Sequence, residues 1–340
     1  MRDSVLIIAE AGVNHNGDIE LAKKLIEVAA QAGADFVKFQ TFKTENLVSK
    51  SAQMADYQQN NLNSQGASQF EMLKKLELDL NMHLILIEHA NKNGIKFLST
   101  AFDLDSIDLL VDLKMPFFKI PSGEIPNKPY LQKIARTKLP VIISTGMADL
   151  IDIENVVNVF KAENYSSEDL SILHCNTEYP TPMGDVNLNA MNTIKNKFDL
   201  EIGYSDHTLG VEVSIAAVAM GARIIEKHFT LDKNMIGPDH KASLNPEELA
   251  LMVRSIRNIE DAFGNGEKSP SKSEIKNMLA ARKSIHVNKE LRKGHELTVL
   301  DLDMKRPSLG ISPMEYEKVI GKTLAIDKLG ESPLKWEDLN

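Results

Sequence analysis

The sequence has a single cysteine, Cys175, among its 340 residues, which excludes an intramolecular disulfide. It contains no apolar run that approaches the roughly 20 residues of a membrane-spanning helix. Acidic residues interrupt its first ten positions, where a secretory signal would be basic and then apolar. We therefore expect a cytoplasmic protein that does not enter a membrane.

Basic residues are also fewer than acidic ones. The 39 Lys and Arg residues face 48 Asp and Glu residues, giving a formal net charge of −9. Binding to nucleic acid through neutralised phosphates needs the opposite balance, so we expect no nucleic-acid partner. Small anionic substrates remain compatible with this charge, because a local pair of lysines is enough to bind them.

Several catalytic signatures are absent. The chain has no Gly-x-Gly-x-x-Gly or Gly-x-x-x-x-Gly-Lys-Ser/Thr loop, which disfavours dinucleotide and P-loop nucleotide chemistry. It has no Cys-x-x-Cys or His-Glu-x-x-His, and no Gly-x-Ser-x-Gly. Cys175 follows His174 inside an expected strand, so the two side chains point to opposite faces and do not form a nucleophile–base pair.

The first three quarters of the chain alternate between short apolar runs and segments of helical period. The runs predict eight strands, at 5–9, 36–39, 96–100, 117–120, 140–144, 170–174, 200–204 and 222–226, and the clearest helices are expected at 19–32, 83–93 and 151–161. This α/β pattern over about 265 residues predicts a (β/α)8 TIM barrel. A doubly wound open sheet is the alternative.

Polar residues at the strand ends favour the barrel, because a closed barrel brings all eight carboxyl ends to one mouth. Lys38 and Gln40 are two residues apart and share one face of their strand, as do Glu226 and His228. A charged side chain inside a barrel is costly unless it is paired or bound to a ligand. We therefore interpret these positions as parts of a site.

The composition changes after residue 263, where a Gly-, Ser- and Lys-rich stretch begins. We expect a barrel domain at 1–265, a linker at 266–282 and a small β-rich domain at 283–340. A domain of this size is marginal alone and is expected to lean on the barrel or on another subunit. The insertion at 43–69, rich in Asn, Gln and Ser, is expected to lie over the mouth.

His207 and His228 end the seventh and eighth expected strands, which are neighbours in a barrel. Two imidazoles at adjacent strand ends can bind one divalent metal ion, with Glu10, Asp206 or Glu226 as possible oxygen ligands. The alternative is that each histidine only forms a hydrogen bond at the barrel rim.

Lys38 and Lys119 form a second group, because their strands and the neighbouring strands also carry hydroxyl groups. Two ammonium groups with several hydroxyl donors suit a phosphate or a carboxylate, whereas a single strand-end lysine is more often solvated or salt-bridged. Glu124 can orient a water molecule or accept a proton, and Asp239 can bind substrate hydroxyls. Both acids are equally compatible with ordinary turn positions.

The ordered motifs closely resemble those of the sialic acid synthase family over nearly the whole chain. They are AEAGVNHNG at 9–17, VKFQT at 37–41, KIPSGE at 119–124, STGM at 144–147, HCNTEYPTP at 174–182, YSDHT at 204–208, EKHFT at 226–230 and GPD at 237–239. In the tail, ARKS at 281–284 and KRP at 305–307 resemble the antifreeze-like (SAF) domain of those enzymes.

The resemblance implies a condensation of phosphoenolpyruvate with an open-chain N-acyl hexosamine that releases phosphate and is assisted by Mn²⁺ or another divalent ion such as Mg²⁺ or Co²⁺. It implies His207 and His228 as metal ligands. Lys38, Lys119, Thr100, Ser122, Ser144 and Ser205 would hold phosphoenolpyruvate, and Glu10, Gln40, Glu124, Asn176, Tyr179 and Asp239 would line the sugar side. Glu124, Glu10 and Lys38 would be the catalytic residues. Arg306 would reach the N-acyl group from the other subunit of a domain-swapped homodimer.

N-acetylmannosamine, giving N-acetylneuraminate, is the expected sugar. A legionaminic or pseudaminic acid synthase that uses a 6-deoxy-diacetamido hexose is the rival within the family, because Ser308 and Leu309 depart from the usual loop after Arg306. Outside the family, the alternatives are an aldolase or lyase with a Schiff base on Lys38 or Lys119, and a non-enzymatic binding protein.

Overall fold

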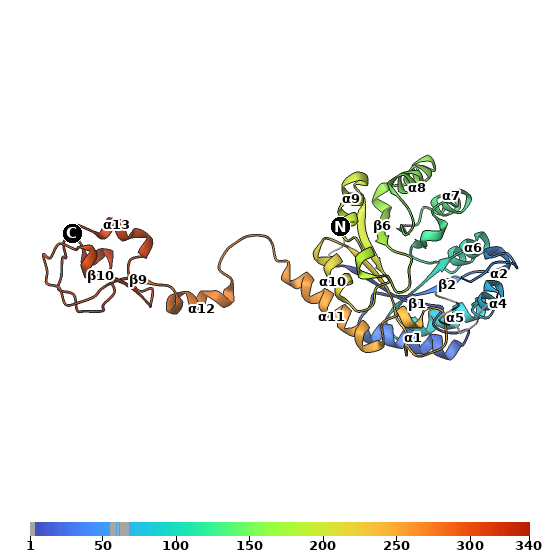
Figure 1. Ribbon diagram of the computed structural model, residues 1–340, viewed down its shortest axis with the longest axis horizontal. Helices are drawn as coiled ribbons and strands as arrows, with labels where there is room; N and C mark the ends of the chain where they lie inside the picture. The colour runs from blue at the N-terminus through green and yellow to red at the C-terminus, as the bar shows by residue number, and fades with distance from the viewer. Residues whose placement is uncertain (1–3, 55–58, 60, 62–67) are drawn as a thin grey trace. The chain divides into compact units, whose positions relative to one another are not determined.

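The computed structural model describes residues 4–54, 59, 61 and 68–340. The chain divides into two compact units, Met1–Gly264 and Asn265–Asn340. In the first unit, helices surround a set of central strands (Figure 1).

Eight parallel strands form the centre of the first unit. They are β1 (Leu6–Gly12), β2 (Phe36–Thr41), β3 (Lys96–Ala101), β4 (Phe118–Ile120), β5 (Val141–Ser144), β6 (Leu170–Cys175), β7 (Glu201–Asp206) and β8 (Ile224–His228). Their order in the sheet is β3-β2-β1-β8-β7-β6-β5-β4. The first and last strands are therefore neighbours, and β3 and β4, at the two ends of this order, also contact each other. This cyclic order confirms the TIM barrel and excludes the open doubly wound sheet.

A layer of helices covers the outside of the strands. It comprises α1 (Ile19–Ala32), α5 (Leu80–Lys92), α6 (Leu104–Asp112), α7 (Lys128–Thr137), α8 (Leu150–Ala162), α9 (Asn189–Phe198), α10 (Glu212–Ala219) and α11 (Pro246–Ala262). The helix expected at 83–93 begins three residues earlier, because the Asp79 carboxylate accepts a hydrogen bond from the backbone N–H of Met82. Apolar residues between strands and helices form one continuous core.

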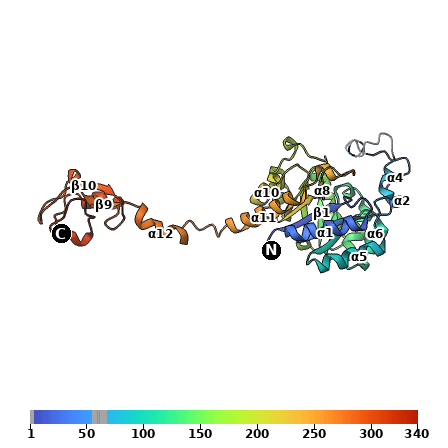
Figure 2. The same cartoon turned by 90° about the horizontal axis from the view of Figure 1, so that it is seen from below.

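The segment between β2 and α5, which includes the expected insertion at 43–69, carries two short helices, α2 (Thr44–Leu47) and α4 (Gln69–Lys74). The two helices lie side by side (Figures 1 and 2). Most of the connection between them lies outside the described residues, so the expected position of the whole insertion over the mouth is tested only at its two ends.

The second unit has its own small core. It contains helix α12 (Lys272–Ala281), the antiparallel pair β9 (Ser284–Val287) and β10 (Leu302–Lys305), and the short helix α13 (Tyr316–Val319). Its buried residues include Ile285, Leu297 and Leu324. The expected β-rich small domain is confirmed, and α12 occupies most of the stretch expected to be a linker.

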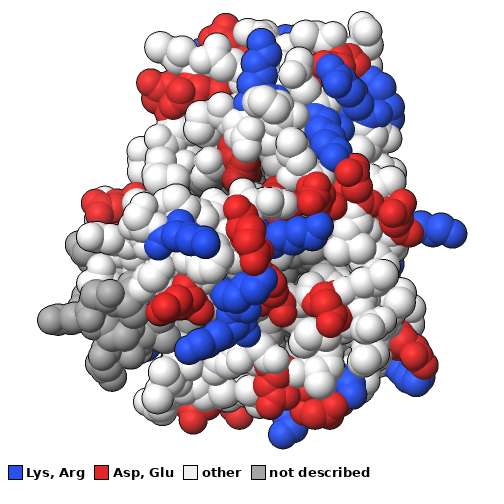
Figure 3. All heavy atoms as spheres, turned by 90° about the vertical axis from the view of Figure 1, so that its right-hand side faces the viewer, with Lys and Arg blue, Asp and Glu red and all other residues white. Residues whose placement is uncertain are grey.

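Among the described residues, the chain forms no helix with the length and apolar character needed to cross a bilayer. On the face of the molecule seen in Figure 3, basic and acidic side chains are interspersed, as a mixed and slightly acidic composition leads us to expect.

Candidate active site

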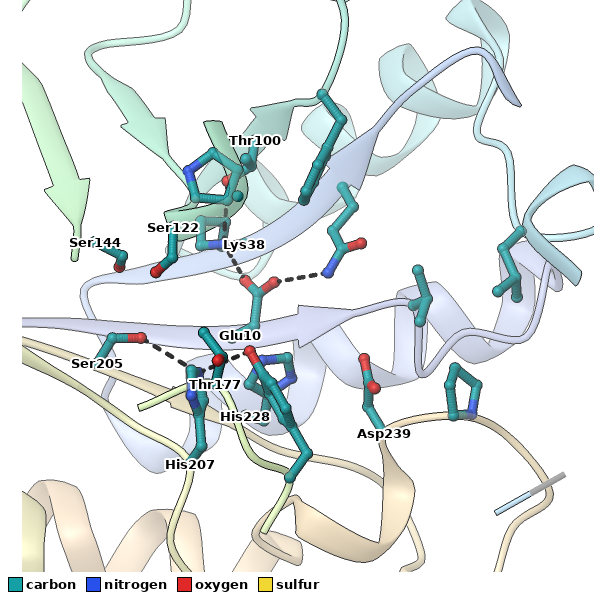
Figure 4. Close-up of a pocket in the computed structure, with 18 of the residues that line it drawn as sticks. Glu10, Lys38, Thr100, Ser122, Ser144, Thr177, Ser205, His207, His228 and Asp239 are labelled. Atoms are coloured by element: carbon teal, nitrogen blue, oxygen red, sulfur yellow. Dashed lines mark hydrogen bonds and ion pairs between the residues drawn. The ribbon is translucent and has the colours of Figure 1, made fainter. Parts of the chain in front are cut away.

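The carboxyl ends of the barrel strands surround a cavity of about 320 Å³. It contains all the residues proposed from the sequence except Glu124, Asn176, Asp206 and Arg306; those that line it are Glu10, Lys38, Gln40, Thr100, Lys119, Ser122, Ser144, Tyr179, Ser205, His207, Glu226, His228 and Asp239. Parallel pairing places Glu10 beside Lys38 on one side and beside His228 on the other. Side chains from strands far apart in the sequence thus meet at one end of the barrel (Figure 4).

The floor of the cavity is a buried network of ion pairs. Lys38 Nζ lies 2.6 Å from Glu10 Oε2 and 3.6 Å from Glu226 Oε2, and Lys119 Nζ lies 3.2 Å from Glu226 Oε1. Lys38 also donates a hydrogen bond to Thr100 Oγ1 at 3.1 Å. Buried charges at this density are costly unless they are paired, and an anionic ligand can replace carboxylates as the partner of the two ammonium groups.

The two carboxyl groups of the floor have opposite pKa shifts. Burial raises the pKa of Glu10, and the attraction of Lys38 offsets this only in part. Burial also acts to raise the pKa of Glu226, but Lys119 and Lys38 together lower it below its ordinary value. Glu226 is therefore a fixed anion, whereas Glu10 can gain or lose a proton near neutral pH.

Glu226 has a larger role than the sequence analysis gave it. The sequence predicted it as a site residue that shares one face of its strand with His228, and as a possible metal ligand. In the structure it also contacts both lysines and accepts a hydrogen bond from Ser205 Oγ at 3.1 Å. Thr177, inside the 174–182 motif, also lines the cavity and was not singled out.

The two histidines lie close together beside the floor, with their ring centroids 5.5 Å apart. His207 Nδ1 donates a hydrogen bond to the backbone carbonyl of Asn176, so the lone pair of the neutral ring is on Nε2. Tyr179 stacks on His207 with ring centroids 4.1 Å apart, and its hydroxyl lies 3.1 Å from that Nε2. Burial lowers the pKa of both histidines, which keeps the rings neutral.

Neutral imidazoles are good ligands for divalent transition metals. Within the described part of the chain, no group of three or more His, Cys, Asp or Glu side chains is arranged to hold a metal ion. The buried Nδ1 of His228 has no hydrogen-bond partner among those residues. The donor set therefore fits an open site with two nitrogen ligands, in which substrate or water supplies the rest.

Four proposed residues lie elsewhere. Asp206, expected as a possible metal ligand, does not line the cavity and is paired with the buried Lys227 Nζ at 2.9 Å. Glu124 follows the floor residue Ser122 on a short 3₁₀ helix, and its carboxylate accepts a hydrogen bond from Asn127 at 2.6 Å rather than lining the cavity. The Asn176 side chain accepts a hydrogen bond from the Glu178 N–H at 2.7 Å, and its backbone orients His207. Arg306 is exposed on the second unit.

One wall of the cavity is apolar, which the sequence analysis did not anticipate. We call this group the apolar wall; its members are Val13, Leu47, Val48, Met72, Leu73, Leu76 and Phe102. Several of them form a small cluster with the buried Phe42, separate from the main core. Leu47 belongs to α2, and Met72 and Leu73 belong to α4. The apolar spacing at 72–76, just after the expected insertion, was the signal that could have indicated them.

This geometry provides two ammonium groups and several hydroxyls for an anion, a carboxyl group able to move a proton, two imidazoles and an apolar wall. A small phosphorylated acid can bind on the floor with a second, largely uncharged substrate above it.

Comparison with known proteins agrees with this site. The sequence profile of the NeuB family matches residues 25–268, and that of the SAF domain matches residues 282–340. N,N'-diacetyllegionaminic acid synthase of Campylobacter jejuni is 55% identical over 93% of this chain and 95% of its own. The enzyme of the same name from Legionella pneumophila is 49% identical over 98% and 94%.

More distant relatives include human N-acetylneuraminate-9-phosphate synthase, which is 35% identical over 94% of this chain and 88% of its own. The crystal structure of N-acetylneuraminic acid synthetase from Leptospira borgpetersenii, in complex with citrate, is 36% identical with a TM-score of 0.71 and covers 81% of this chain and 90% of its own. These matches extend over the barrel and the tail alike, and the chain therefore belongs to the NeuB family of phosphoenolpyruvate-utilising nonulosonic acid synthases.

Proposed function

We propose that this protein acts in the cytoplasm as an N,N'-diacetyllegionaminic acid synthase. It condenses phosphoenolpyruvate with the open-chain form of a 6-deoxy-diacetamido hexose and releases phosphate. The observation that carries the choice of sugar is the identity of 55% and 49% to two synthases of that name, compared with 35% to the human N-acetylneuraminate-9-phosphate synthase. N-acetylmannosamine, the first expectation from the sequence, becomes the second candidate.

Phosphoenolpyruvate binds on the floor of the cavity. Lys38 and Lys119 exchange their pairs with Glu10 and Glu226 for the phosphate and carboxylate of the substrate, and Thr100, Ser122, Ser144 and Ser205 donate hydrogen bonds to the same oxygens. The sugar lies above it, where Gln40, Tyr179 and Asp239 contact its hydroxyl and amide groups. Fixing the two reactants in this order is a large part of the catalysis.

A divalent ion such as Mn²⁺, Mg²⁺ or Co²⁺, held by His207 and His228, would polarise the aldehyde oxygen of the sugar. The neutral state of both rings and the lone pair on His207 Nε2 support this assignment.

In the reaction, C3 of phosphoenolpyruvate forms a bond to the aldehyde carbon, and water adds to the cation that develops at C2. Cleavage of the C2–O bond then releases phosphate and leaves the 2-keto acid. Water gives up one proton as it adds and the new alkoxide takes one, so a single carboxyl can carry that proton. The second proton of the water passes to the departing phosphate as the C2–O bond breaks. Glu10 suits this role because its pKa is raised and it lines the cavity. Glu124, the earlier candidate, does not line the cavity, and its carboxylate accepts a hydrogen bond from Asn127.

The direct test is a purified protein incubated with phosphoenolpyruvate, Mn²⁺ and each candidate sugar, with phosphate release followed and the product mass measured. Phosphate release that depends on the 6-deoxy-diacetamido hexose supports the proposal. Preferential use of N-acetylmannosamine would instead support the second candidate, a synthase of N-acetylneuraminate. Borohydride with pyruvate tests the lyase alternative, because only a Schiff-base enzyme leaves a reduced lysine adduct.

The active assembly that we propose is a domain-swapped homodimer in which Arg306 of the partner subunit contacts the N-acyl group. Exposed apolar side chains on both units support this. Met147, Leu209 and Ile236 lie on loops that follow barrel strands, and Leu300 and Met314 lie on the second unit. Mixing the inactive variants Arg306→Ala and His228→Ala should restore activity, because the mixed dimer contains one complete site. A monomer in solution, or no restoration, would contradict the swap.

A further inference from the structure

Polar side chains are followed by apolar ones at the ends of the first three strands. Val13 follows Glu10 just after β1, Phe42 follows Lys38 and Gln40 just after β2, and Phe102 follows Thr100 just after β3. Because each residue advances a strand by about 3.3 Å, these steps of two to four residues place the apolar wall above the ion pairs, nearer the mouth.

The apolar wall is firmly supported. Phe102 packs edge-on against the buried Phe42, with ring centroids 6.4 Å apart, and its backbone N–H donates to the Thr41 carbonyl at 3.0 Å. Val13 and Leu76 are 5% and 6% exposed. The side chains of Leu47, Val48, Met72 and Leu73 are half-buried and line the cavity. Three of them, Leu47, Met72 and Leu73, pack against the buried cluster.

The reacting aldehyde must lie next to the floor, where phosphoenolpyruvate, the histidines and Glu10 are. The far end of the open-chain sugar then extends toward the mouth and reaches the height of the apolar wall. A methyl group there loses contact with water favourably, whereas a hydroxyl group facing this wall would be left without a hydrogen-bond partner.

A phosphate group at that end of the sugar would bind even less favourably than a hydroxyl group, because its charge needs a nearby cation. Among the described residues that line the cavity, Lys38 and Lys119 are the cations, and both lie on the floor. Residues 55–67 contain no Lys or Arg in the sequence. Lys75 lines a second cavity of about 340 Å³ that shares Met72, Leu76 and Pro238 with the first.

We propose that the apolar wall is the subsite for the C6 methyl group, and that it selects a 6-deoxy sugar over its 6-hydroxy and 6-phosphate forms. This inference rests on the proposed function and assigns its sugar specificity to particular side chains. Met72 and Val48, which border the cavity without being fully buried, are the positions at which polarity is most easily introduced.

The test compares wild-type protein with Met72→Gln and Val48→Thr, two substitutions that add polarity with little change in size. The matched control is Leu84→Gln, at a side chain 51% exposed on α5 and outside the cavity. Each protein is assayed for kcat/KM with the 6-deoxy-diacetamido hexose, with its 6-hydroxy counterpart, which differs only at C6, and with N-acetylmannosamine 6-phosphate.

Wild-type protein is expected to prefer the 6-deoxy sugar over its 6-hydroxy counterpart by roughly tenfold or more, and to use the phosphorylated sugar least. Each wall variant should reduce the first preference by roughly five- to tenfold, mainly through the KM of the sugar, and leave the KM of phosphoenolpyruvate unchanged. The control should match wild type.

Two kinds of failure are separable. If wild-type protein uses none of these sugars, the proposed function fails. If it uses the 6-deoxy sugar but the two variants retain the full preference for it over the 6-hydroxy form, the proposed function stands and the inference about the wall is wrong. Comparable use of the 6-phosphate by wild type would also overturn the inference.

Discussion

Lys227 Nζ lies 2.9 Å from Asp206 Oδ2, and neither side chain is exposed to solvent. The two residues are paired in register across β7 and β8, and each directly precedes one of the two cavity histidines. Asp206 also accepts hydrogen bonds from Thr208 and Ser214, and Lys227 donates to the Thr208 carbonyl. This ion pair therefore joins the strand ends that present His207 and His228.

Replacing one partner should be costly, because it leaves the other charge buried without compensation. We expect Lys227→Met to lower the free energy of unfolding by about 3–5 kcal/mol. The double variant Lys227→Met with Asp206→Leu should recover a large part of that loss. Urea denaturation followed by circular dichroism measures both, and an unchanged midpoint for the single variant would contradict the argument.

His207→Ala and His228→Ala should each abolish tight Mn²⁺ binding and leave the protein folded, because each removes one of the two nitrogen ligands that we propose. Titration of Mn²⁺ monitored by electron paramagnetic resonance measures the bound fraction without relying on turnover. His89→Ala is the control, since His89 lies on α5 and pairs with Glu27 at 2.9 Å. Wild-type affinity in both cavity variants would show that the ion binds elsewhere.

Glu226→Gln should move the alkaline limit of phosphoenolpyruvate binding to lower pH. Burial lowers the pKa of Lys119, and the negative charge of Glu226 partly restores it. Without that charge the Lys119 ammonium loses its proton at a lower pH, and an uncharged amine binds phosphate weakly. The KM of phosphoenolpyruvate measured against pH tests this, and a curve identical to that of wild type would disprove it.

Sugar binding should weaken in acid through Asp239. Burial raises the pKa of this side chain to about 6, so it is charged above that pH and neutral below it. If the carboxylate form binds the sugar, its KM should rise about tenfold per pH unit below 6. Asp239→Asn should have a higher KM that does not vary over the same range. A sloping profile in that variant would point to another group.

Stability should depend on pH through His15, which is fully buried with its Nδ1 accepting a hydrogen bond from the Gly17 N–H at 3.0 Å. Burial lowers its pKa from 6.5 to about 4. Between these values the unfolded chain binds more protons, so stability falls as the pH is lowered, by about 1.4 kcal/mol per unit.

Glu10 and Asp239 act in the opposite direction, because their raised pKa values let the folded state bind more protons. The measurement is therefore the difference between wild type and His15→Asn, a substitution that retains an acceptor for Gly17. The amount by which the unfolding free energy of wild type exceeds that of His15→Asn should decrease as the pH falls from 6.5 toward 4. A constant gap would contradict the prediction.

The barrel could be predicted because its evidence is local. Each strand has a short apolar run, each helix has a 3.6-residue period, and a polar residue where a strand ends must face the mouth. The spacing of Lys38 and Gln40, or of Glu226 and His228, fixes which side chains share a face before any tertiary contact is known.

Contacts between strands could not be obtained in that way. The pairing of lysines with carboxylates depends on the stagger of β1, β2, β4 and β8 around the barrel. The sequence therefore did not show that Glu226 contacts both Lys38 and Lys119, whereas the structure does. Glu124 shows the converse, since its motif is close to the cavity but its side chain turns to Asn127.

The sequence by itself determined the alternation of strands and helices, the polar strand ends and the family resemblance, because periodicity and motifs are properties of neighbouring residues. Only the tertiary structure decided that Leu47 of α2 and Met72 of α4 join Phe102 in one apolar wall above the charged floor. Such a wall is built by packing between segments distant in the chain, and no local pattern specifies it.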